Sequence, residues 1–370
     1  MKILIVLPRI HNNIIPFVDS LEEQGYKVHL ISLRSVPMDM QIRFNASQLK
    51  RSFLTSILIS MTNFYRRERN ELPGFYLPNL VDLFYLFYKH QPKYLVVRDR
   101  TITSYIFLLI GYITKSKLYI YNQLPILNTK ISYLFFKNVT TLSPVLYYAD
   151  ELLNIDMDIM ELAYGFKHIN RIWTPFVVRN LKDISSTLPS TEFSGTIICV
   201  ARFEPYKNIE ILVHAFSEIK DIHEYVNLKL IGSITKPNNN YYQKISALVD
   251  SLHLRDVELI TNVSYQNMET IYEPGSVMVL PSYKDDASVA VAEALSHGIP
   301  VISSNSNGTA CYIKDGYNGF VFENNSIEDL TAKLKHMISA CNYGEFSANA
   351  IKFSSKFLSK DNFKEFVAKL

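Results

Sequence analysis

Two cations stand in a short loop whose position suits the binding of an anion. Arg202 and Lys207 bound the segment RFEPYK, between a predicted strand at 196–200 and a predicted helix at 208–219. A loop that follows a parallel strand lies at the carboxyl edge of the sheet, where open α/β sheets bind ligands. Arg can donate two parallel hydrogen bonds to a phosphate, and Lys can act on it as a point charge. Two exposed basic residues of a surface loop are the alternative interpretation, since Lys and Arg are mostly exposed.

A second polar segment follows another predicted strand. Residues 277–280 are a short apolar run that ends at a proline, as expected for a buried parallel strand. Asp285, Asp286 and Ser288 then precede the apolar segment 289–295, so they are candidates for the N-cap and first turn of a helix. The unpaired N–H groups at the start of such a helix favour phosphate.

Glu293 is the one carboxylate in this helix of Ala, Val and Leu residues. A single Glu on a helix is usually solvated, so by itself it predicts no site. The alternation of strands and helices, however, places Arg202 and Lys207 on the same sheet edge as the start of this helix. Glu293 is therefore expected to form one wall of the anion site.

The elements that position these residues alternate between strand and helix, which predicts two parallel sheets. In the first half we expect strands at 2–7, 27–33, 94–97 and 117–121 and a helix at 14–24. In the second half we expect strands at 196–200, 228–231, 257–260 and 277–280 and helices at 208–219, 241–252, 268–272 and 289–295. The first strand-to-helix loop has no glycine, which disfavours a dinucleotide-binding oxidoreductase.

Length and composition indicate a globular protein of two domains. The chain has 370 residues, 48% hydrophobic and 20% charged, which is more than one core usually fills. We expect domains at 1–180 and 181–350, joined by a looser segment at 172–194, and a C-terminal helix at 351–370 that packs back toward the first domain. Three widely spaced cysteines predict neither disulfides nor a metal site, and favour a reducing, cytoplasmic location.

The charge is distributed unevenly between the two halves. Residues 1–180 carry a net +8 and the remainder a net −5. Segment 43–70 surrounds an apolar centre with basic residues, so it is either a packed helix with solvated ends or an amphipathic face that lies on an anionic membrane. Aromatic segments at 75–88 and 105–112 add apolar surface to this half. Nucleic acid is a weaker candidate, because no recognised binding motif is present.

Asp156-Met157-Asp158 has the D-x-D spacing that binds a metal-nucleotide in some sugar transferases. It lies in a helical-looking segment, 151–164, and not after a strand. We interpret it as a solvated helix face and predict no metal site.

Residues 195–340 resemble the C-terminal, nucleotide-sugar-binding domain of retaining glycosyltransferases that have the GT-B fold and a Glu-x7-Glu motif. The matching segments, in order, are ARFEPYKNIEILVHAF, LKLIGS, VELITNV, YEPGSVMVLPS, AEALSHGIPVISS and DGYNGFVF. Their order and spacing over about 150 residues carry the resemblance. It implies an α/β fold of GT-B architecture, with two Rossmann-like parallel-sheet domains that face each other across a cleft.

The resemblance also implies roles for individual residues. Arg202 and Lys207 would bind the donor diphosphate and stabilise the charge that grows on it as the glycosidic bond breaks. Glu293, at the second Glu position, would hold the ribose hydroxyls, and the start of its helix would offer N–H groups to phosphate and sugar. The expected donor-binding residues are Glu293, Asp286, Ala287, Ser288, Val289, Gly232 and Asn262.

The chain departs from the family pattern at several positions. The first motif position is Asp285, and the usual Gly-Phe-Gly after it is Asp286-Ala287-Ser288. Where the N-terminal domain often supplies a His near the reacting sugar, this chain has Asn122 and Gln123, which would act as neutral hydrogen-bonding groups. We assign Asp285 and Gln123 to the catalytic residues together with Arg202 and Lys207.

The resemblance implies a retaining, metal-independent glycosyltransferase of the hexosyltransferase class. It would transfer a sugar from a UDP- or GDP-type donor to a glycan, lipid-linked as in bacterial surface polysaccharide, O-antigen or lipopolysaccharide synthesis, at the inner face of the cell membrane. The alternative is a non-catalytic subunit that partners another glycosyltransferase, which Asp285 and the missing His motivate. A GT-B epimerase is weaker, because such enzymes use a different set of His and acidic residues. No cofactor, metal or nucleic acid is expected.

Overall fold

The computed structural model describes residues 1–7, 10, 14–34, 43–57, 77–98, 102–122, 145–147, 171–173, 176–179, 181–234, 239–283, 285, 288–339 and 342–360. The described residues up to Trp173 form one compact unit, and those from Phe176 onward form a second. Each unit contains its own parallel sheet.

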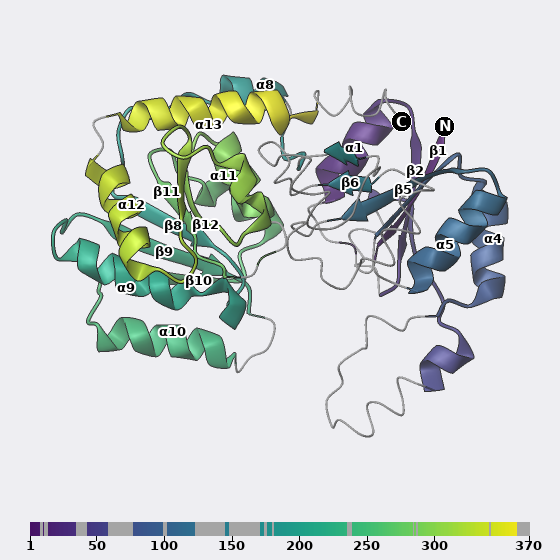
Figure 1. Ribbon diagram of the computed structural model, residues 1–370, viewed down its shortest axis with the longest axis horizontal. Helices are drawn as coiled ribbons and strands as arrows, with labels where there is room; N and C mark the ends of the chain where they lie inside the picture. The colour runs from purple at the N-terminus through teal and green to yellow at the C-terminus, as the bar shows by residue number, and fades with distance from the viewer. Residues whose placement is uncertain are drawn as a thin grey trace, which may run out of the picture. The chain divides into compact units, whose positions relative to one another are not determined.

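The described part of the first unit is a seven-stranded sheet with helices (Figure 1). Its strands lie in the order β3-β2-β1-β4-β5-β6-β7, and all of their pairings are parallel. The strands are β1 (Lys2–Leu7), β2 (Lys27–Ser32), β3 (Ala46–Gln48), β4 (Tyr94–Arg98), β5 (Lys117–Asn122), β6 (Val145–Tyr147) and β7 (Arg171–Trp173). The helices are α1 (Ile15–Glu23), α4 (Leu80–His90) and α5 (Ile102–Ile113), and residues 53–57 are also helical.

Helix α4 has a clear start signal, and both α4 and α5 have clear stop signals. The side chain of Asn79 accepts hydrogen bonds from the N–H groups of Val81 and Asp82, which caps α4 at its first turn. Gln91 and Lys115 follow the two helices with φ of 42° and 58°, a left-handed conformation that ends a helix. The sequence thus sets both the lengths of these helices and the loops that lead into β4 and β5.

The second unit contains a six-stranded sheet in the order β10-β9-β8-β11-β12-β13, again with parallel pairings throughout. The strands are β8 (Thr196–Val200), β9 (Asn227–Gly232), β10 (Val257–Thr261), β11 (Val277–Leu280), β12 (Val301–Ser304) and β13 (Gly319–Phe322). The α-helices are α8 (Leu181–Ser186), α9 (Ile209–Lys220), α10 (Asn240–Ser251), α11 (Val289–Ser296), α12 (Ile327–Ser339) and α13 (Tyr343–Phe357), and the 3-10 helices are η4 (Pro205–Lys207), η5 (Tyr265–Ile271) and η6 (Gly308–Tyr312).

The core of this unit follows from its apolar runs. The four residues of β11 are all fully buried, as is usual for a central strand covered on both faces. Helix α11 buries Val291, Ala292 and Leu295, and its small residues allow it to pack closely on α13. The packing fixes the start of α11 at the carboxyl end of β11.

The expected α/β fold with two Rossmann-like sheets is confirmed. Strands 2–7, 196–200 and 277–280 have the predicted bounds, and the other predicted strands, together with the helices predicted at 14–24, 208–219, 241–252 and 289–295, differ by one residue at one or both ends. The helix expected at 268–272 is the 3-10 helix η5, and the C-terminal helix expected at 351–370 begins at Tyr343. No bounds were predicted for strands β3, β6, β7, β12 and β13 or for helices α8 and α12. The looser segment expected at 172–194 is wrong in part, since it contains the end of β7 and all of α8. The last helix, α13, packs against α8 and α11 of its own unit, and residues 361–370 lie outside the described residues.

Candidate functional site

The loops after β8 and β11 lie side by side, because these two strands are neighbours at the centre of the sheet. The chain runs outward from β8 through β9 to β10, and then returns to β11 on the other side of β8. Such a reversal of strand order opens a crevice at the carboxyl ends of the strands, where α/β sheets bind ligands. A hydrogen bond of 3.1 Å from the N–H of Tyr283 to the carbonyl of Tyr206 ties the two loops together.

Lys207 and Asp285 meet at this point. Lys207 Nζ forms an ion pair and hydrogen bond with Asp285 Oδ2, and the two side chains are only 9% and 11% exposed. The hydroxyl of Ser282 lies 3.4 Å from the same Oδ2 atom, and the N–H of Gly308 donates to the carbonyl of Asp285 at 3.2 Å. Asp285 is thus held from three sides, and the ammonium of Lys207 is fixed at the edge of the sheet.

Arg202 lies in the same loop but is more exposed, with a side chain 53% accessible. Its Nη1 contacts Glu204 Oε1 at 2.7 Å, and its Nη2 donates a hydrogen bond to the Tyr206 hydroxyl. Both cations lie near the Tyr206 ring, with the Arg202 Cζ 5.8 Å and the Lys207 Nζ 5.1 Å from its centre. Burial raises the pKa of Tyr206 to about 12, so this hydroxyl keeps its proton at neutral pH.

The start of α11 is arranged by the loop after β12. Ser288 is the buried N-cap residue, and its N–H donates to the Thr309 hydroxyl at 3.3 Å, while Val289 is the first helical residue. A phosphate oxygen that used the Ser288 N–H would therefore replace the Thr309 oxygen. Asp286 and Ala287, predicted to line the same site, lie outside the described residues.

Glu293 belongs to a group of three side chains, in which Tyr272 is buried and Glu293 and His297 are half-buried. Tyr272 donates a hydrogen bond of 2.6 Å from its hydroxyl to Glu293 Oε2. Burial raises the pKa of Glu293, and the hydrogen bond from Tyr272 lowers it in part. His297 stacks on Tyr272 with the ring centres 5.0 Å apart, and its Nδ1 lies 2.9 Å from the Glu293 carbonyl oxygen. These contacts fix one carboxylate oxygen of Glu293.

Gly232 and Asn262 lie at the same edge of the sheet and connect neighbouring strands. A Cβ added at Gly232 would lie 2.0 Å from the Ala201 carbonyl oxygen, so only glycine allows β9 to approach the β8 loop this closely. Asn262 has a φ of 56°, donates its N–H to the Gly232 carbonyl at 2.9 Å and accepts from the Ile234 N–H at 3.0 Å. Gly232 shapes the edge through its backbone, and Asn262 does so through its backbone N–H and its side-chain Oδ1.

Three expectations for the first half of the sequence lie outside the described side chains. Gln123 and Asp156-Met157-Asp158 are outside the described residues, and only the backbone of Asn122 is described, as the last residue of β5. Within the part of the chain that the structure describes, no group of three or more His, Cys, Asp or Glu residues could hold a metal ion.

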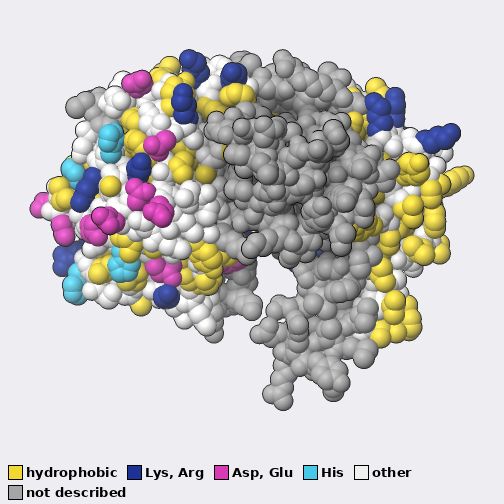
Figure 2. All heavy atoms as spheres, in the orientation of Figure 1, with side chains coloured by type: hydrophobic (Ala, Val, Ile, Leu, Met, Phe, Trp, Pro, Cys, Tyr) yellow, Lys and Arg dark blue, Asp and Glu magenta, His cyan; other side chains and the backbone are white. Residues whose placement is uncertain are grey.

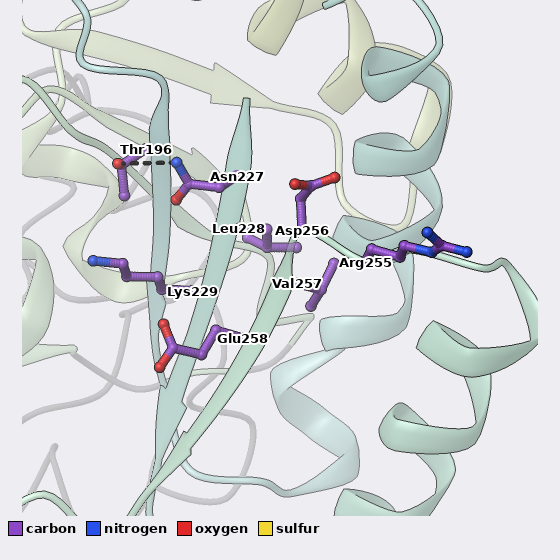
Figure 3. A pocket seen from close by; sticks show the side chains of 8 residues that line it. All are labelled: Thr196, Asn227, Leu228, Lys229, Arg255, Asp256, Val257 and Glu258. Carbon is purple, nitrogen blue, oxygen red and sulfur yellow. Dashed lines mark hydrogen bonds between the residues drawn. The ribbon is translucent and has the colours of Figure 1, made fainter. Parts of the chain in front are cut away.

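A pocket of about 450 Å³ in the second unit lies at the opposite edge of the sheet (Figure 3). It is formed by the first residues of three strands, Thr196, Asn227 and Val257, with Lys229 and Glu258 along its side. The cations of the β8 loop are at the carboxyl ends of the strands, so this pocket is separate from the candidate site.

Residues 183–353 match the family model described as glycosyl transferases group 1. The match lies within the second unit and covers less than half of the chain. The match covers both loops of the candidate site, from Arg202 to Glu293. Within this unit, Tyr206, Tyr272 and Thr309 contact the predicted residues, and the sequence pattern indicates no role for these three.

The similar proteins are glycosyltransferases or share the fold. An uncharacterized glycosyltransferase of Methanocaldococcus jannaschii is 31% identical over 159 residues, which are 43% of this chain and 42% of that protein. The chain therefore spans less than half the length of this curated relative in the match. The structure of a glycosyltransferase from Rickettsia africae aligns over 100% of this chain and 97% of its own chain, with a TM-score of 0.74 and 14% sequence identity. The structure of Anabaena HepE in complex with UDP aligns over 100% of this chain and 99% of its own chain, with a TM-score of 0.73 and 12% sequence identity. The chain thus has the GT-B fold.

Proposed function

We propose that the protein is a retaining, metal-independent glycosyltransferase that transfers a hexose-type sugar from a nucleoside diphosphate sugar to a glycan. The observation that carries this proposal is the buried Lys207 ammonium at the carboxyl end of β8, beside the start of α11. The family match within the second unit supports it. The similar Anabaena protein binds UDP, which supports a UDP-type donor over a GDP-type donor.

At the diphosphate, the proposed chemistry needs stabilisation of negative charge. The protein forms no covalent bond to the diphosphate. As the bond from the sugar to the diphosphate breaks, negative charge grows on the leaving phosphate. Lys207 and Arg202, which both lie within 6 Å of the Tyr206 ring, would receive that charge. Preorganised donors of this kind can lower a barrier by several kcal/mol, on the order of 3–4 kcal/mol for one group.

Glu293 would bind the ribose of the donor through the carboxylate oxygen that Tyr272 leaves available. A buried carboxylate that accepts hydrogen bonds from a diol discriminates against a ligand that lacks the hydroxyls, because it would otherwise be left unpaired. Asp286, Ala287, Val289 and Gln123 are retained as proposed contacts of the phosphate, the sugar and the reaction centre.

The proposed acceptor is a glycan carried by a lipid at the inner face of the cell membrane, as in bacterial surface polysaccharide synthesis. The net charge of +8 on residues 1–180 supports this location, because anionic lipids attract basic surfaces. The acceptor domain is expected within this half.

A non-catalytic subunit is the second candidate, and the Lys207–Asp285 pair favours it. The ammonium proposed to bind diphosphate already has a carboxylate partner. A subunit that does not bind donor has no need of a free cation at this edge.

Calorimetry with UDP, GDP, TDP and ADP sugars separates the two candidates. The transferase should bind at least one of them, and Lys207→Ala and Glu293→Ala should each abolish transfer while circular dichroism shows a retained fold. NMR of the product should show the anomeric configuration of the donor. Absence of binding to all four donors would favour the non-catalytic subunit, and full activity of either variant would refute the site assignment.

A further inference from the structure

Large apolar side chains are exposed on one face of the first unit. Of seventeen exposed large hydrophobic residues in the described part of the chain, twelve lie on helical residues 53–57, α4 and α5. We define the α4–α5 face by Val81, Phe84, Tyr88, Leu109, Tyr112 and Ile113. Their exposed fractions are 79%, 58%, 78%, 61%, 63% and 68%.

These residues form one continuous stripe on each helix. Val81, Phe84 and Tyr88 recur at helical spacing on α4, and Leu109, Tyr112 and Ile113 do so on α5. The opposite stripes are buried, and Phe87 and Phe107 join the two helices with ring centres 5.7 Å apart. Figure 2 shows hydrophobic side chains gathered over α4 and α5. Exposed apolar patches of this kind mark interaction sites.

Lysines gather at one end of the same face. Lys89 lies in the last turn of α4, Lys93 precedes β4, Lys115 lies between α5 and β5, and Lys117 is the first residue of β5. Lys93 and Lys117 Nζ lie 5.8 and 5.5 Å from the centre of the Tyr94 ring. Among the described residues 77–98 and 102–122 there are five Lys or Arg and a single acid. The apolar face therefore has a strongly cationic end.

An open groove joins the two features. It has a volume of about 650 Å³ and lies at the end of α5, lined by the exposed Tyr112 and Ile113 and by the exposed Lys115 and Lys117. An aromatic ring, an aliphatic side chain and two ammonium groups in one groove suit a phosphate group with attached acyl chains.

We propose that the α4–α5 face binds the surface of an anionic phospholipid bilayer, with the lysine end at the headgroup phosphates. A second copy of the chain is a weaker occupant, because a twofold contact would bring these lysines together with few acids to pair them. Among the described helices, none combines the length and the apolar content that crossing a bilayer requires. The face would therefore lie on the membrane, as interfacial helices with exposed Phe, Tyr and Leu do.

This inference deepens the membrane location of the proposed function but does not depend on sugar transfer. The test is sedimentation of the full chain with vesicles of phosphatidylcholine alone and of phosphatidylcholine mixed with phosphatidylglycerol, at low and high salt. The wild type should bind only the anionic vesicles, and less at high salt. Lys115→Gln/Lys117→Gln should weaken binding about 30-fold, as expected for two charges at ~1 kcal/mol each.

The apolar side of the face is tested with the fourfold variant Phe84→Ser/Tyr88→Ser/Leu109→Ser/Ile113→Ser. This variant should bind anionic vesicles at least about 10-fold more weakly, because each buried CH2 contributes ~0.8 kcal/mol. Leu188→Ser/Ile222→Ser removes exposed apolar residues of the second unit and should bind as the wild type does. Lys352→Gln/Lys356→Gln is the control for charge. Circular dichroism should show that every variant is folded.

Several results would overturn the inference. The first is a wild type that binds no anionic vesicle at low salt, and the second is an apolar variant that binds like the wild type. A wild-type dimer in sedimentation equilibrium that becomes a monomer in the apolar variant would assign the face to a second copy. Calorimetry with UDP sugars is separate: vesicle binding without donor binding would refute the proposed transferase and leave the inference standing.

Discussion

Lys207 and Asp285 form an ion pair that joins the loops after the two central strands β8 and β11. From the sequence, Lys207 is expected on the diphosphate, and Asp285 is expected at the first motif position as a catalytic residue. The structure brings the two side chains into contact with each other. Asp285 is thus a counter-ion of the cation that the proposed reaction uses.

We expect Asp285→Asn to increase the affinity for a nucleoside diphosphate by roughly 5-fold or more, because removal of a like charge near the diphosphate is favourable by at least ~1 kcal/mol. It should also lower the free energy of unfolding by about 3 kcal/mol, since the buried Lys207 loses its partner. Calorimetry and urea unfolding measure the two effects.

Asp256→Asn is the matched control for this variant. Asp256 pairs with Lys220 at 2.9 Å at the opposite edge of the sheet and is 47% exposed. It should change neither quantity by more than about 0.5 kcal/mol. Weaker diphosphate binding by Asp285→Asn would show that Asp285 supports the ligand and does not compete with it.

The hydroxyl of Tyr272 is expected to position Glu293 for the ribose. Tyr272→Phe keeps the ring that stacks on His297 but removes the hydrogen bond of 2.6 Å. The affinity for UDP should fall about 10-fold, as expected for a hydrogen bond to a charged group. The affinity for 2′,3′-dideoxy UDP should be unchanged, because that ligand has no diol for Glu293.

Tyr343→Phe removes a comparable hydroxyl, which donates at 2.6 Å to the Ser276 carbonyl in the same unit. It should lower the free energy of unfolding and leave both affinities as they are.

The pH dependence of UDP binding gives an independent readout of the role of Tyr272. The Tyr272 hydrogen bond lowers the Glu293 pKa, so in Tyr272→Phe that pKa should rise and UDP binding should weaken at a higher pH as acid is added. An equal loss for both ligands would refute the role of Tyr272.

His29 and His90 should make the first unit sensitive to acid. Their rings stack with centres 3.9 Å apart, and His29 is buried. Burial and the neighbouring His90 lower the pKa of His29 to about 4, and burial and Lys89 lower the pKa of His90. Both imidazoles are therefore neutral in the folded protein, while the unfolded chain binds protons near the ordinary pKa of about 6.5.

The free energy of unfolding is thus expected to fall as the pH decreases from about 6.5 toward 4, because the unfolded state takes up more protons in this range. Thermal unfolding of His29→Phe/His90→Phe should depend less on pH in that window. His223→Gln, in the second unit, should behave as the wild type. If thermal unfolding of His29→Phe/His90→Phe depends on pH as it does in the wild type, other groups cause the acid sensitivity.

Gly232 is expected to be essential for the shape of the site. Gly232→Ala would place a Cβ 2.0 Å from the Ala201 carbonyl, so β9 and the β8 loop must separate. We expect a loss of more than ~2 kcal/mol in the free energy of unfolding and weaker diphosphate binding. Gly344→Ala, in α13, meets no atom closer than 3.4 Å and should be neutral or stabilising. Urea unfolding of both variants distinguishes these outcomes, and a neutral Gly232→Ala would contradict the close approach.

The sequence determined the central strands of the second unit and the resemblance to glycosyltransferases. The strands at 196–200 and 277–280 were predictable because each is a short apolar run with a polar segment directly after it, and a parallel sheet buries such runs on both faces. The helix after Ser288 followed from the same alternation. Order and spacing of the short motifs then indicated the glycosyltransferase resemblance, which the family match of residues 183–353 confirms.

Only the tertiary structure decided which side chains meet. Lys207 and Asp285 are 78 positions apart, and they touch because β11 lies next to β8 and not beside β10. An apolar strand has the same pattern in any position of a parallel sheet, so the pattern does not contain the strand order. For the same reason the sequence did not predict the contact between Tyr272 and Glu293. It placed Arg202 and Lys207 at one edge of the sheet, but it did not predict that both side chains contact Tyr206.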